Sequence, residues 1–244
     1  MIRAVIFDMD GTLVRTEHLK TLSYSQALDL LEPGATHLHQ TAEAFKDVVG
    51  LSREEVADHL LERTGLCDAA ARRAQELGVS TPRDALLAER LHLYLNMVRE
   101  PGALRRYRIR HTVDFLFSAR DQGYRIGLAT GATCETASKV LASIELADCF
   151  DAIISGYDVP HNKPAPDIYL LAAERLGLRP DECLAVEDSQ VGVRSAVSAG
   201  MRCIAVTTVY TSRGVHECGL LPADQIVDDT AHLLAVATRI LSEQ

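Results

Sequence analysis

The chain has 244 residues, which can hold one large α/β domain or a core plus a smaller insert. Its composition, 47% hydrophobic and 24% charged, is ordinary for a soluble globular protein. Its formal net charge of −9 argues against a general binder of nucleic acid or of anionic membranes. An anionic substrate would therefore need a local positive centre, either a metal ion or a few well-placed cations.

The six cysteines are widely spread and include no C-x-x-C pair. We therefore expect reduced, mostly buried thiols rather than a disulfide framework or a zinc site. The N-terminal apolar run is too short for a signal peptide, and no apolar stretch approaches the length of a membrane span. These features predict a cytoplasmic protein without a membrane or nucleic-acid partner.

The first predicted strand, Ile2–Phe7, runs directly into two carboxylates, Asp8 and Asp10, and then into Gly11. Open α/β sheets keep their chemistry at the carboxyl ends of their strands. The spacing suits one site in which Asp8 attacks as a nucleophile while Asp10 moves protons. An acidic turn without catalytic function is the alternative, and the rest of the chain has to decide between the two.

A different region follows, because residues 17–99 show helical periodicity and almost no β-rich runs. Ser52 precedes Glu55 at the spacing of a capping box, and Thr81-Pro82 supplies a cap and a first-turn proline. The expected helices cover residues 19–31, 40–48, 52–64, 68–77 and 82–98. An all-helical insert placed directly after two acids predicts a lid over the site, while a subdomain packed on one edge is the alternative.

From residue 123 onward, strands and helices alternate. The predicted strands cover residues 125–129, 151–155, 183–187, 202–206 and 226–227, with helices ending near 143 and over 166–176 and 189–199. Such alternation indicates parallel strands joined by crossover helices. The predicted fold class is α/β: a doubly wound, Rossmann-like parallel sheet as the core (residues 1–16 and 105–244) with an inserted all-helical cap domain (residues 17–104).

Polar groups suited to a phosphate or a metal follow several of these strands. Thr130 and Gly131 offer a hydroxyl and a backbone N–H, Lys163 precedes a helix, and Glu187 and Asp188 end another strand. Lys163 is one of only four lysines in the chain, so it is less readily dismissed as an incidental surface charge. Carboxylates that meet near one lysine form the hard-oxygen site that Mg²⁺ prefers, with a substrate phosphate completing its ligands.

Four segments, taken in order, resemble the four signature motifs of the haloacid dehalogenase superfamily. They are Asp8-Met-Asp10-Gly-Thr-Leu, Thr130-Gly131, Lys163-Pro-Ala-Pro-Asp, and Glu187-Asp188-Ser189 with Gly192. The resemblance covers the predicted core, and the helical insert after the first motif is similar to the branch that holds phosphoglycolate phosphatases, sugar phosphatases and β-phosphoglucomutases.

This resemblance implies a role for each motif residue. Asp8 would attack phosphorus and form an aspartyl-phosphate, and Asp10 would protonate the leaving oxygen and then deprotonate the attacking water. Thr130, Gly131 and Lys163 would bind the phosphoryl group. The implied cofactor is Mg²⁺, held by the Asp8 and Asp188 carboxylates and the Asp10 carbonyl oxygen, with Glu187 a ligand or one layer further out. The resemblance also argues against the dehalogenase branch, which breaks a carbon–halogen bond and lacks the second acid that this chain has at Asp10.

The insert leaves the substrate open. Arg53 lies in a segment that resembles the cap segment whose arginine holds a distal phosphate in β-phosphoglucomutases, although it could equally be a solvated residue at a helix start. The mutases carry a histidine at position 20, where this chain has Lys20. Lys20 therefore favours water over a sugar hydroxyl as the group that dephosphorylates Asp8. The Lys20 side chain itself could lie near the substrate or on the solvent face of its helix.

The predicted function is a Mg²⁺-dependent phosphatase that acts on a small phosphorylated substrate, of the sugar phosphate or phosphoglycolate type. A β-phosphoglucomutase-like phosphomutase is the alternative, and a non-catalytic protein that binds a phosphorylated ligand is a third interpretation. A dinucleotide or P-loop site is excluded because G-x-G-x-x-G and G-K-[ST] are both absent. The arginine-rich run 105–110 is expected to be a solvated hinge.

Overall fold

The computed structural model describes residues 1–45, 48, 51–99, 102 and 104–242. Two compact units divide the chain, one formed by Met1–Arg15 with Glu100–Gln244 and the other by Thr16–Arg99. The helical insert lies between the first and second strands, as the sequence predicts. The functional assignment of residues 1–16 and 105–244 as a catalytic core, and of 17–104 as a cap, stays a prediction.

The first unit is built on a parallel sheet of six strands in the order β3-β2-β1-β4-β5-β6. The strands are β1 (Ala4–Phe7), β2 (Arg125–Thr130), β3 (Ala152–Ser155), β4 (Cys183–Glu187), β5 (Arg202–Val206) and β6 (Ile226–Val227). The N-terminal strand β1 therefore lies in the middle of the sheet, between β2 and β4. This order brings the ends of three strands that are far apart in the sequence to one place.

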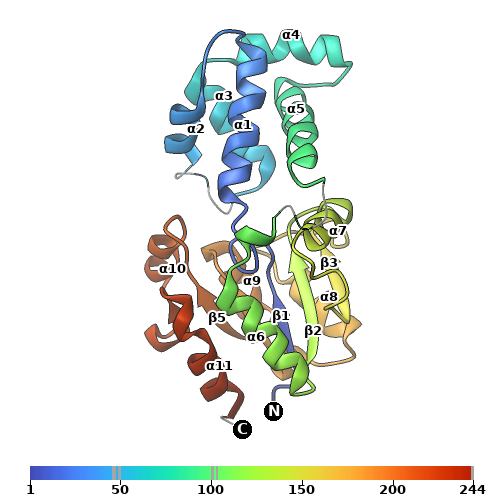
Figure 1. Ribbon diagram of the computed structural model, residues 1–244, viewed down its shortest axis with the longest axis vertical. Coiled ribbons are helices and arrows are strands. Elements are labelled where there is room, and N and C mark those ends of the chain that lie inside the picture. Colours follow the sequence, from blue (N-terminus) through green and yellow to red (C-terminus); the bar gives the residue numbers. More distant parts are fainter. Residues whose placement is uncertain (46–47, 49–50, 100–101, 103, 243–244) are drawn as a thin grey trace. The chain divides into compact units, whose positions relative to one another are not determined.

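Helices cover both faces of this sheet, so the doubly wound α/β prediction is confirmed (Figure 1). On one face, buried side chains of α8 and α9, such as Ala172 and Val193, pack with Ile6 of β1 in one apolar cluster. On the other face, the ring of Phe7 lies 5.7 Å from the ring of Phe115 in α6. The helices of this unit are α6 (Arg110–Asp121), α7 (Cys134–Ser143), α8 (Asp167–Arg175), α9 (Gln190–Ser198), α10 (Ser212–Cys218) and α11 (Leu233–Ser242), and the short 3₁₀ turns are Arg105–Tyr107, Pro180–Glu182, Ala223–Gln225 and Thr230–His232.

The second unit is helical throughout its described residues, as predicted. Its helices are α1 (Glu17–Leu31), α2 (Leu38–Phe45), α3 (Arg53–Thr64), α4 (Cys67–Leu77) and α5 (Pro82–Met97). Ser52 and Thr81 each cap a helix within a complete capping box, and Gly65 and Gly78 end helices in the left-handed conformation. Side chains such as Leu28, Leu60 and Leu86 form the buried apolar core of this unit.

The arginine-rich run is only partly solvated, which corrects the sequence-based interpretation. The side chain of Arg108 is 19% exposed, because its guanidinium contacts the Ile144 carbonyl oxygen at 2.5 Å and the Glu145 carboxylate at 3.1 Å. Those groups end α7, where a cation is favourable because helix carbonyls point outward. Arg108 also pairs with Val14 in an antiparallel bridge, and this bridge ties the segment after β1 to the segment before α6.

The thiols also differ from the expectation in their burial. All six cysteines are free, but only Cys183 and Cys203 are buried, while Cys67 and Cys134 are exposed. The expectation that most are buried was therefore wrong, because helix starts such as those of α4 and α7 place a small residue at the surface.

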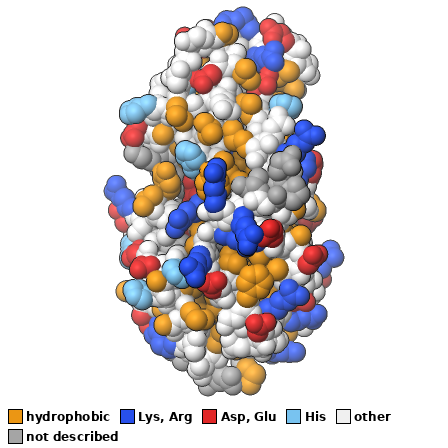
Figure 2. Space-filling view, viewed as in Figure 1, with side chains coloured by type: hydrophobic (Ala, Val, Ile, Leu, Met, Phe, Trp, Pro, Cys, Tyr) orange, Lys and Arg blue, Asp and Glu red, His pale blue; other side chains and the backbone are white. Residues whose placement is uncertain are grey.

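Two further observations concern the surface. None of the helices within the described ranges is both long and apolar enough to cross a bilayer. Acidic and basic side chains intermix over the face shown in Figure 2. Some charged side chains of the chain pair with a side chain four residues away in the same helix, such as Lys139 with Glu135 in α7 and Arg213 with Glu217 in α10. Pairs of this kind are worth little in stability and leave no broad field of a single sign.

Candidate active site

The candidate site lies where the strands β2, β1 and β4 end. Phe7, the last residue of β1, is in register with Leu128 of β2 and Val186 of β4. Asp8 therefore leaves the sheet between the end of β2 and the end of β4, and its backbone N–H donates to the Val186 carbonyl oxygen at 2.9 Å. The position of this carboxylate is thus set by the backbone ladder.

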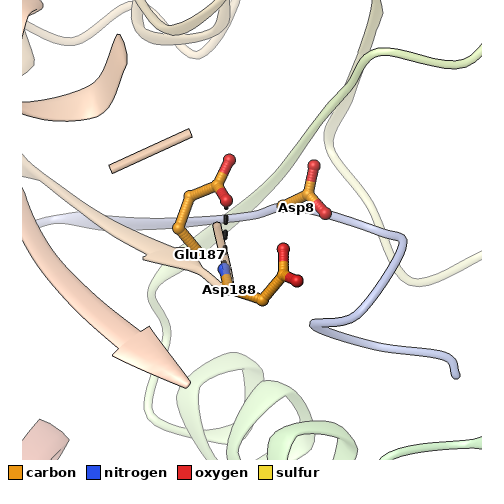
Figure 3. A group of neighbouring side chains, drawn as sticks. All are labelled: Asp8, Glu187 and Asp188. Carbon is orange, nitrogen blue, oxygen red and sulfur yellow. Dashed lines mark hydrogen bonds between the residues drawn. The ribbon is translucent and has the colours of Figure 1, made fainter. Parts of the chain in front are cut away.

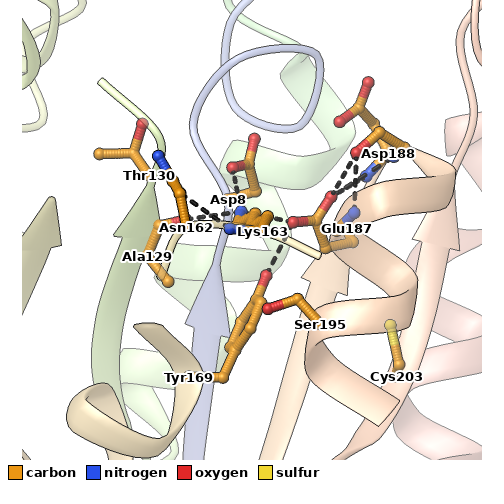
Figure 4. Close-up of polar contacts among 12 residues, drawn as sticks. Asp8, Ala129, Thr130, Asn162, Lys163, Tyr169, Glu187, Asp188, Ser195 and Cys203 are labelled. Atoms are coloured by element: carbon orange, nitrogen blue, oxygen red, sulfur yellow. Dashed lines mark hydrogen bonds and ion pairs between the residues drawn. The ribbon is translucent and has the colours of Figure 1, made fainter. Parts of the chain in front are cut away.

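Lys163 joins the strand ends through its ammonium group (Figure 4). The Nζ atom lies 2.6 Å from Asp8 Oδ1, 2.5 Å from Glu187 Oε1 and 3.0 Å from the Ala129 carbonyl oxygen. Its side chain is only 9% exposed and Glu187 is fully buried. Because an ammonium has three N–H donors, these contacts use all of its protons.

Burial and charge shift the pKa values of this cluster in physically clear directions. Burial raises the pKa of Asp8 to about 7; Lys163 opposes this rise, while the nearby charge of Glu187 adds to it. Burial alone would lower the pKa of Lys163, but the carboxylates of Asp8 and Glu187 outweigh burial and raise it. Lys163 is therefore a permanent cation, whereas the protonation of Asp8 depends on its surroundings.

Glu187 is held at both carboxylate oxygens. Oε1 accepts from Lys163 and from the Tyr169 hydroxyl at 2.9 Å. Oε2 accepts from the Asp188 backbone N–H at 3.0 Å and from the backbone and hydroxyl of Ser189. Gly192 in α9 leaves the room for this carboxylate, because a Cβ there would lie 1.9 Å from its carbon. These donors satisfy both oxygens of a carboxylate that is out of contact with solvent.

Asp8, Glu187 and Asp188 form a group that could hold a metal ion (Figure 3). Each offers a carboxylate oxygen, and these oxygens lie within 4.8 Å of one another. Gly11, with a φ of +85°, passes close beneath this group, since a Cβ there would lie 2.2 Å from Asp188 Oδ2. An all-carboxylate donor set fits a hard divalent cation such as Mg²⁺, Mn²⁺ or Ca²⁺.

Asp10 lies in the tight turn that follows Asp8, where Gly11 N–H donates to the Val14 carbonyl oxygen at 2.8 Å. Its negative charge is one of those that raise the pKa of Asp8. On the opposite side, buried Thr130 is the last residue of β2, and its hydroxyl oxygen accepts from the Ala132 N–H at 3.2 Å. Gly131 follows at the exposed edge of the sheet. The structure thus brings the predicted site residues of the first unit to one edge of its sheet: Asp8, Asp10, Thr130, Gly131, Lys163, Glu187 and Asp188.

The two predicted insert residues belong to the second unit. Lys20 lies in α1 and Arg53 is the first residue of α3, where its Nε contacts the Glu54 carboxylate at 3.2 Å. Arg53 also accepts a hydrogen bond from the Tyr24 hydroxyl through its carbonyl oxygen. Arg53 therefore lies at the start of a helix capped by Ser52, as predicted. A role of Lys20 or Arg53 toward the substrate stays a prediction.

Tyr169 is the site residue that sequence reasoning missed. It lies in α8 among Ile168, Ala172 and Ala173, so its position in the sequence marks it as a core residue. Its hydroxyl nevertheless donates to Glu187, and its ring centre lies 5.2 Å from Lys163 Nζ. The available signal was that a buried tyrosine hydroxyl requires a polar partner. The identity of that partner depends on the packing of α8 against β4.

The comparison with known families agrees with this geometry. The profile of the haloacid dehalogenase-like hydrolases matches residues 2–200. The chain belongs to this family. Among curated relatives, protein CbbY of Rhodobacter capsulatus is 31% identical over 223 residues, which are 86% of this chain and 87% of the relative. Hexitol phosphatase B of Escherichia coli (strain K12) is 32% identical over 206 residues, 84% of this chain and 83% of the relative.

A solved structure also shares the fold of this haloacid dehalogenase-like chain. CbbY (mutant D10N) from Rhodobacter sphaeroides, in complex with xylulose-(1,5)bisphosphate, matches with a TM-score of 0.73 and 24% identity, covering 97% of this chain and 99% of that one. At this identity the match shows a common fold. Together with the family profile and the curated relatives, the acidic group identifies the chain as a phosphatase of the haloacid dehalogenase type.

The close contact at Gly192 gives a prediction. Gly192→Ala forces Glu187 away from Lys163, and overpacking of this kind costs about 1–3 kcal/mol in the free energy of unfolding. Phosphatase turnover should fall at least about tenfold with it. Gly214→Ala in α10 is the control, because its Cβ would lie 3.1 Å from the end of the flexible Gln190 side chain and at an ordinary contact distance of 3.7 Å from Gln190 Cβ. Urea unfolding and phosphate release measure both variants, and full turnover of Gly192→Ala would contradict the assignment.

The raised pKa of Asp8 gives a second prediction for the metal-free protein. Between the ordinary value of 3.8 and about 7, the folded protein keeps a proton that the unfolded chain has released. The free energy of unfolding of the wild type should therefore fall as the pH rises through this range, relative to Asp8→Asn, which lacks that proton. Urea unfolding of both proteins in a chelator, from pH 4 to pH 7, measures the difference, and parallel curves would show that Asp8 titrates normally.

Proposed function

We propose that this phosphatase hydrolyses the phosphomonoester of a small phosphorylated metabolite, of the sugar phosphate or phosphoglycolate type, with Mg²⁺ as cofactor and through a phosphorylated Asp8. The observation that carries the proposal is the contact of one buried ammonium, Lys163, with both Asp8 and Glu187 beside Asp188. A nucleophile, a fixed cation and a group of carboxylates at one sheet edge are the parts that phosphoryl transfer requires.

The donors present fit a divalent cation. Asp8 and Asp188 offer carboxylate oxygens for Mg²⁺, and the carbonyl oxygen of Asp10 is a further candidate ligand. Glu187 is better suited to hold Lys163, since both of its oxygens already accept hydrogen bonds. When bound, the ion neutralises charge on the phosphoryl oxygens. It also favours the ionised form of Asp8, the form that acts as a nucleophile.

In the first step, an Asp8 carboxylate oxygen attacks phosphorus, so that the bond from this oxygen to phosphorus forms while the bond from phosphorus to the leaving oxygen breaks. Asp10 donates its proton to that leaving oxygen, and the alcohol departs. Lys163 holds Asp8 Oδ1 in place during the attack. The Thr130 hydroxyl and the backbone at Gly131 bind the phosphoryl oxygens.

In the second step, water replaces the alcohol. Asp10, now ionised, takes a proton from the water, whose oxygen attacks phosphorus and breaks the bond to Asp8. Inorganic phosphate leaves, and both aspartates return to their starting states. A sugar hydroxyl in place of the water would make the protein a phosphomutase. Lys20, at the position where mutases carry a histidine, favours water.

The substrate class rests on the relatives and on charge. Hexitol phosphatase B, by its name, acts on a phosphorylated sugar alcohol, and the CbbY complex holds a sugar bisphosphate. Because the net charge is −9, such an anion needs local positive charge, which Lys163 and a metal ion at the carboxylates would supply. Arg53 of the second unit is the candidate for contact with a distal anionic group of the substrate.

A panel of phosphomonoesters, including phosphoglycolate and several sugar phosphates, tests the proposal. Phosphate release should require Mg²⁺, vanish in Asp8→Asn, and fall about 10²–10⁴-fold in Asp10→Asn, as expected for loss of a general acid and base. Conversion of β-glucose 1-phosphate to the 6-phosphate without phosphate release would support the mutase instead. Release that persists in Asp8→Asn would overturn the role of Asp8.

A further inference from the structure

Asn162 occupies a position beside the phosphoryl site that the proposed mechanism leaves unused. It lies in the segment between β3 and α8, directly before Lys163, and its side chain is exposed to solvent and hence to a ligand. The carbonyl oxygen of Asn162 accepts from the Ala165 N–H at 3.0 Å, and the Ala165 carbonyl oxygen accepts from buried Ser195 at 2.5 Å. The backbone on which the Asn162 side chain stands is therefore fixed.

The orientation of the Asn162 amide follows from a single contact. The backbone N–H of Lys163 donates to Asn162 Oδ1 at 2.9 Å, and only the amide oxygen can accept such a bond. The amide nitrogen, Nδ2, consequently points to the other side. Gly156 leaves room for the amide, because a Cβ there would lie 2.3 Å from Nδ2. A Cβ on Gly131 would be at an ordinary contact distance from the same amide, 3.8 Å from Nδ2 and 3.9 Å from Oδ1.

The amide of Asn162 thus lies beside Gly131, and Figure 4 shows Asn162 on the Thr130 side of Lys163. Within the described part of the chain, the protein supplies no acceptor for its two N–H groups. The site also needs donors, because Lys163 spends its three on Asp8, Glu187 and Ala129. A phosphoryl group carries several strong acceptor oxygens, and a neutral amide can bind one of them without competing for the Asp8 carboxylate.

We propose that Asn162 is a further substrate-binding residue, whose Nδ2 donates a hydrogen bond to an oxygen of the phosphoryl group bound at Thr130 and Gly131. This inference rests on the proposed function. A hydrogen bond to a charged acceptor is worth about 1.5–3 kcal/mol, so its loss corresponds to a decrease of about 10–100-fold in kcat/KM. The competing explanation is that Asn162 only shapes the loop through its Oδ1 contact with Lys163.

Two variants separate these roles. Asn162→Asp keeps the oxygen that accepts from the Lys163 N–H but replaces the NH₂ group with a second oxygen. Asn162→Ala removes both groups. If Nδ2 binds the phosphoryl group, the kcat/KM of Asn162→Ala is about 10–100-fold below that of the wild type. The kcat/KM of Asn162→Asp is lower still, because a carboxylate then faces the phosphate. If Asn162 only shapes the loop, Asn162→Asp stays near the wild type while Asn162→Ala falls, and this order would overturn the inference.

The measurements are kcat and KM for each variant, and the affinity for inorganic phosphate in the presence of Mg²⁺ by calorimetry. Phosphate binding should weaken in the same order, while the midpoint of thermal unfolding stays unchanged. His161→Ala is the matched control, since its side chain is 76% exposed and its one polar contact among the described residues is with Asp167; it should retain wild-type values.

The experiment also separates this inference from the proposed function. If the wild type releases phosphate and Asn162→Ala has the same kcat/KM and the same affinity for phosphate, the role of Asn162 is overturned and the proposed function stands. A wild type that releases no phosphate from any substrate would overturn the function. The phosphate titration then still decides the role of Asn162, because equal affinities of the wild type and both variants would exclude a contact.

Discussion

The ammonium group of Lys163, held between the carboxylates of Asp8 and Glu187, is the interaction on which the rest of the core depends. Charged groups taken out of water cost several kcal/mol each unless they are paired and fully hydrogen-bonded. Here the ammonium has three acceptors, and Glu187 has donors at both oxygens. The pairing requires β1 to lie between β2 and β4, so the sheet order and the charge cluster support each other.

The same cluster forms the group that could hold a metal ion. Three carboxyl groups, those of Asp8, Glu187 and Asp188, lie together beside one ammonium, and burial opposes the charge on Asp8 strongly enough to raise its pKa to about 7. Two glycines, Gly11 and Gly192, let the backbone approach these carboxylates so closely that no side chain would fit. A divalent cation favours the ionised nucleophile, so metal binding and nucleophile activation are one event in this account.

Much of this could be predicted from the sequence, because strand periodicity and the polar residues that follow each strand are local signals. The elements around Asp8, Thr130 and Glu187 formed close to their expected bounds. The contacts of Tyr169 and of the partly buried Arg108 were missed, since their partners come from residues distant in the sequence and depend on how helices pack. The proposed roles of Lys20 and Arg53 toward a substrate stay predictions, because they depend on a ligand and not on a sequence pattern.

The most direct test of the central claim is whether Asp8 takes on a phosphoryl-like group. Beryllium fluoride mimics a phosphoryl group attached to a carboxylate, and ¹⁹F NMR reports its bound fluorine atoms as separate signals. The account predicts bound signals in the wild type that require Mg²⁺ and are absent in Asp8→Asn. Bound signals that persist in Asp8→Asn, or that form equally well in a chelator, would contradict a metal-assisted attack by Asp8.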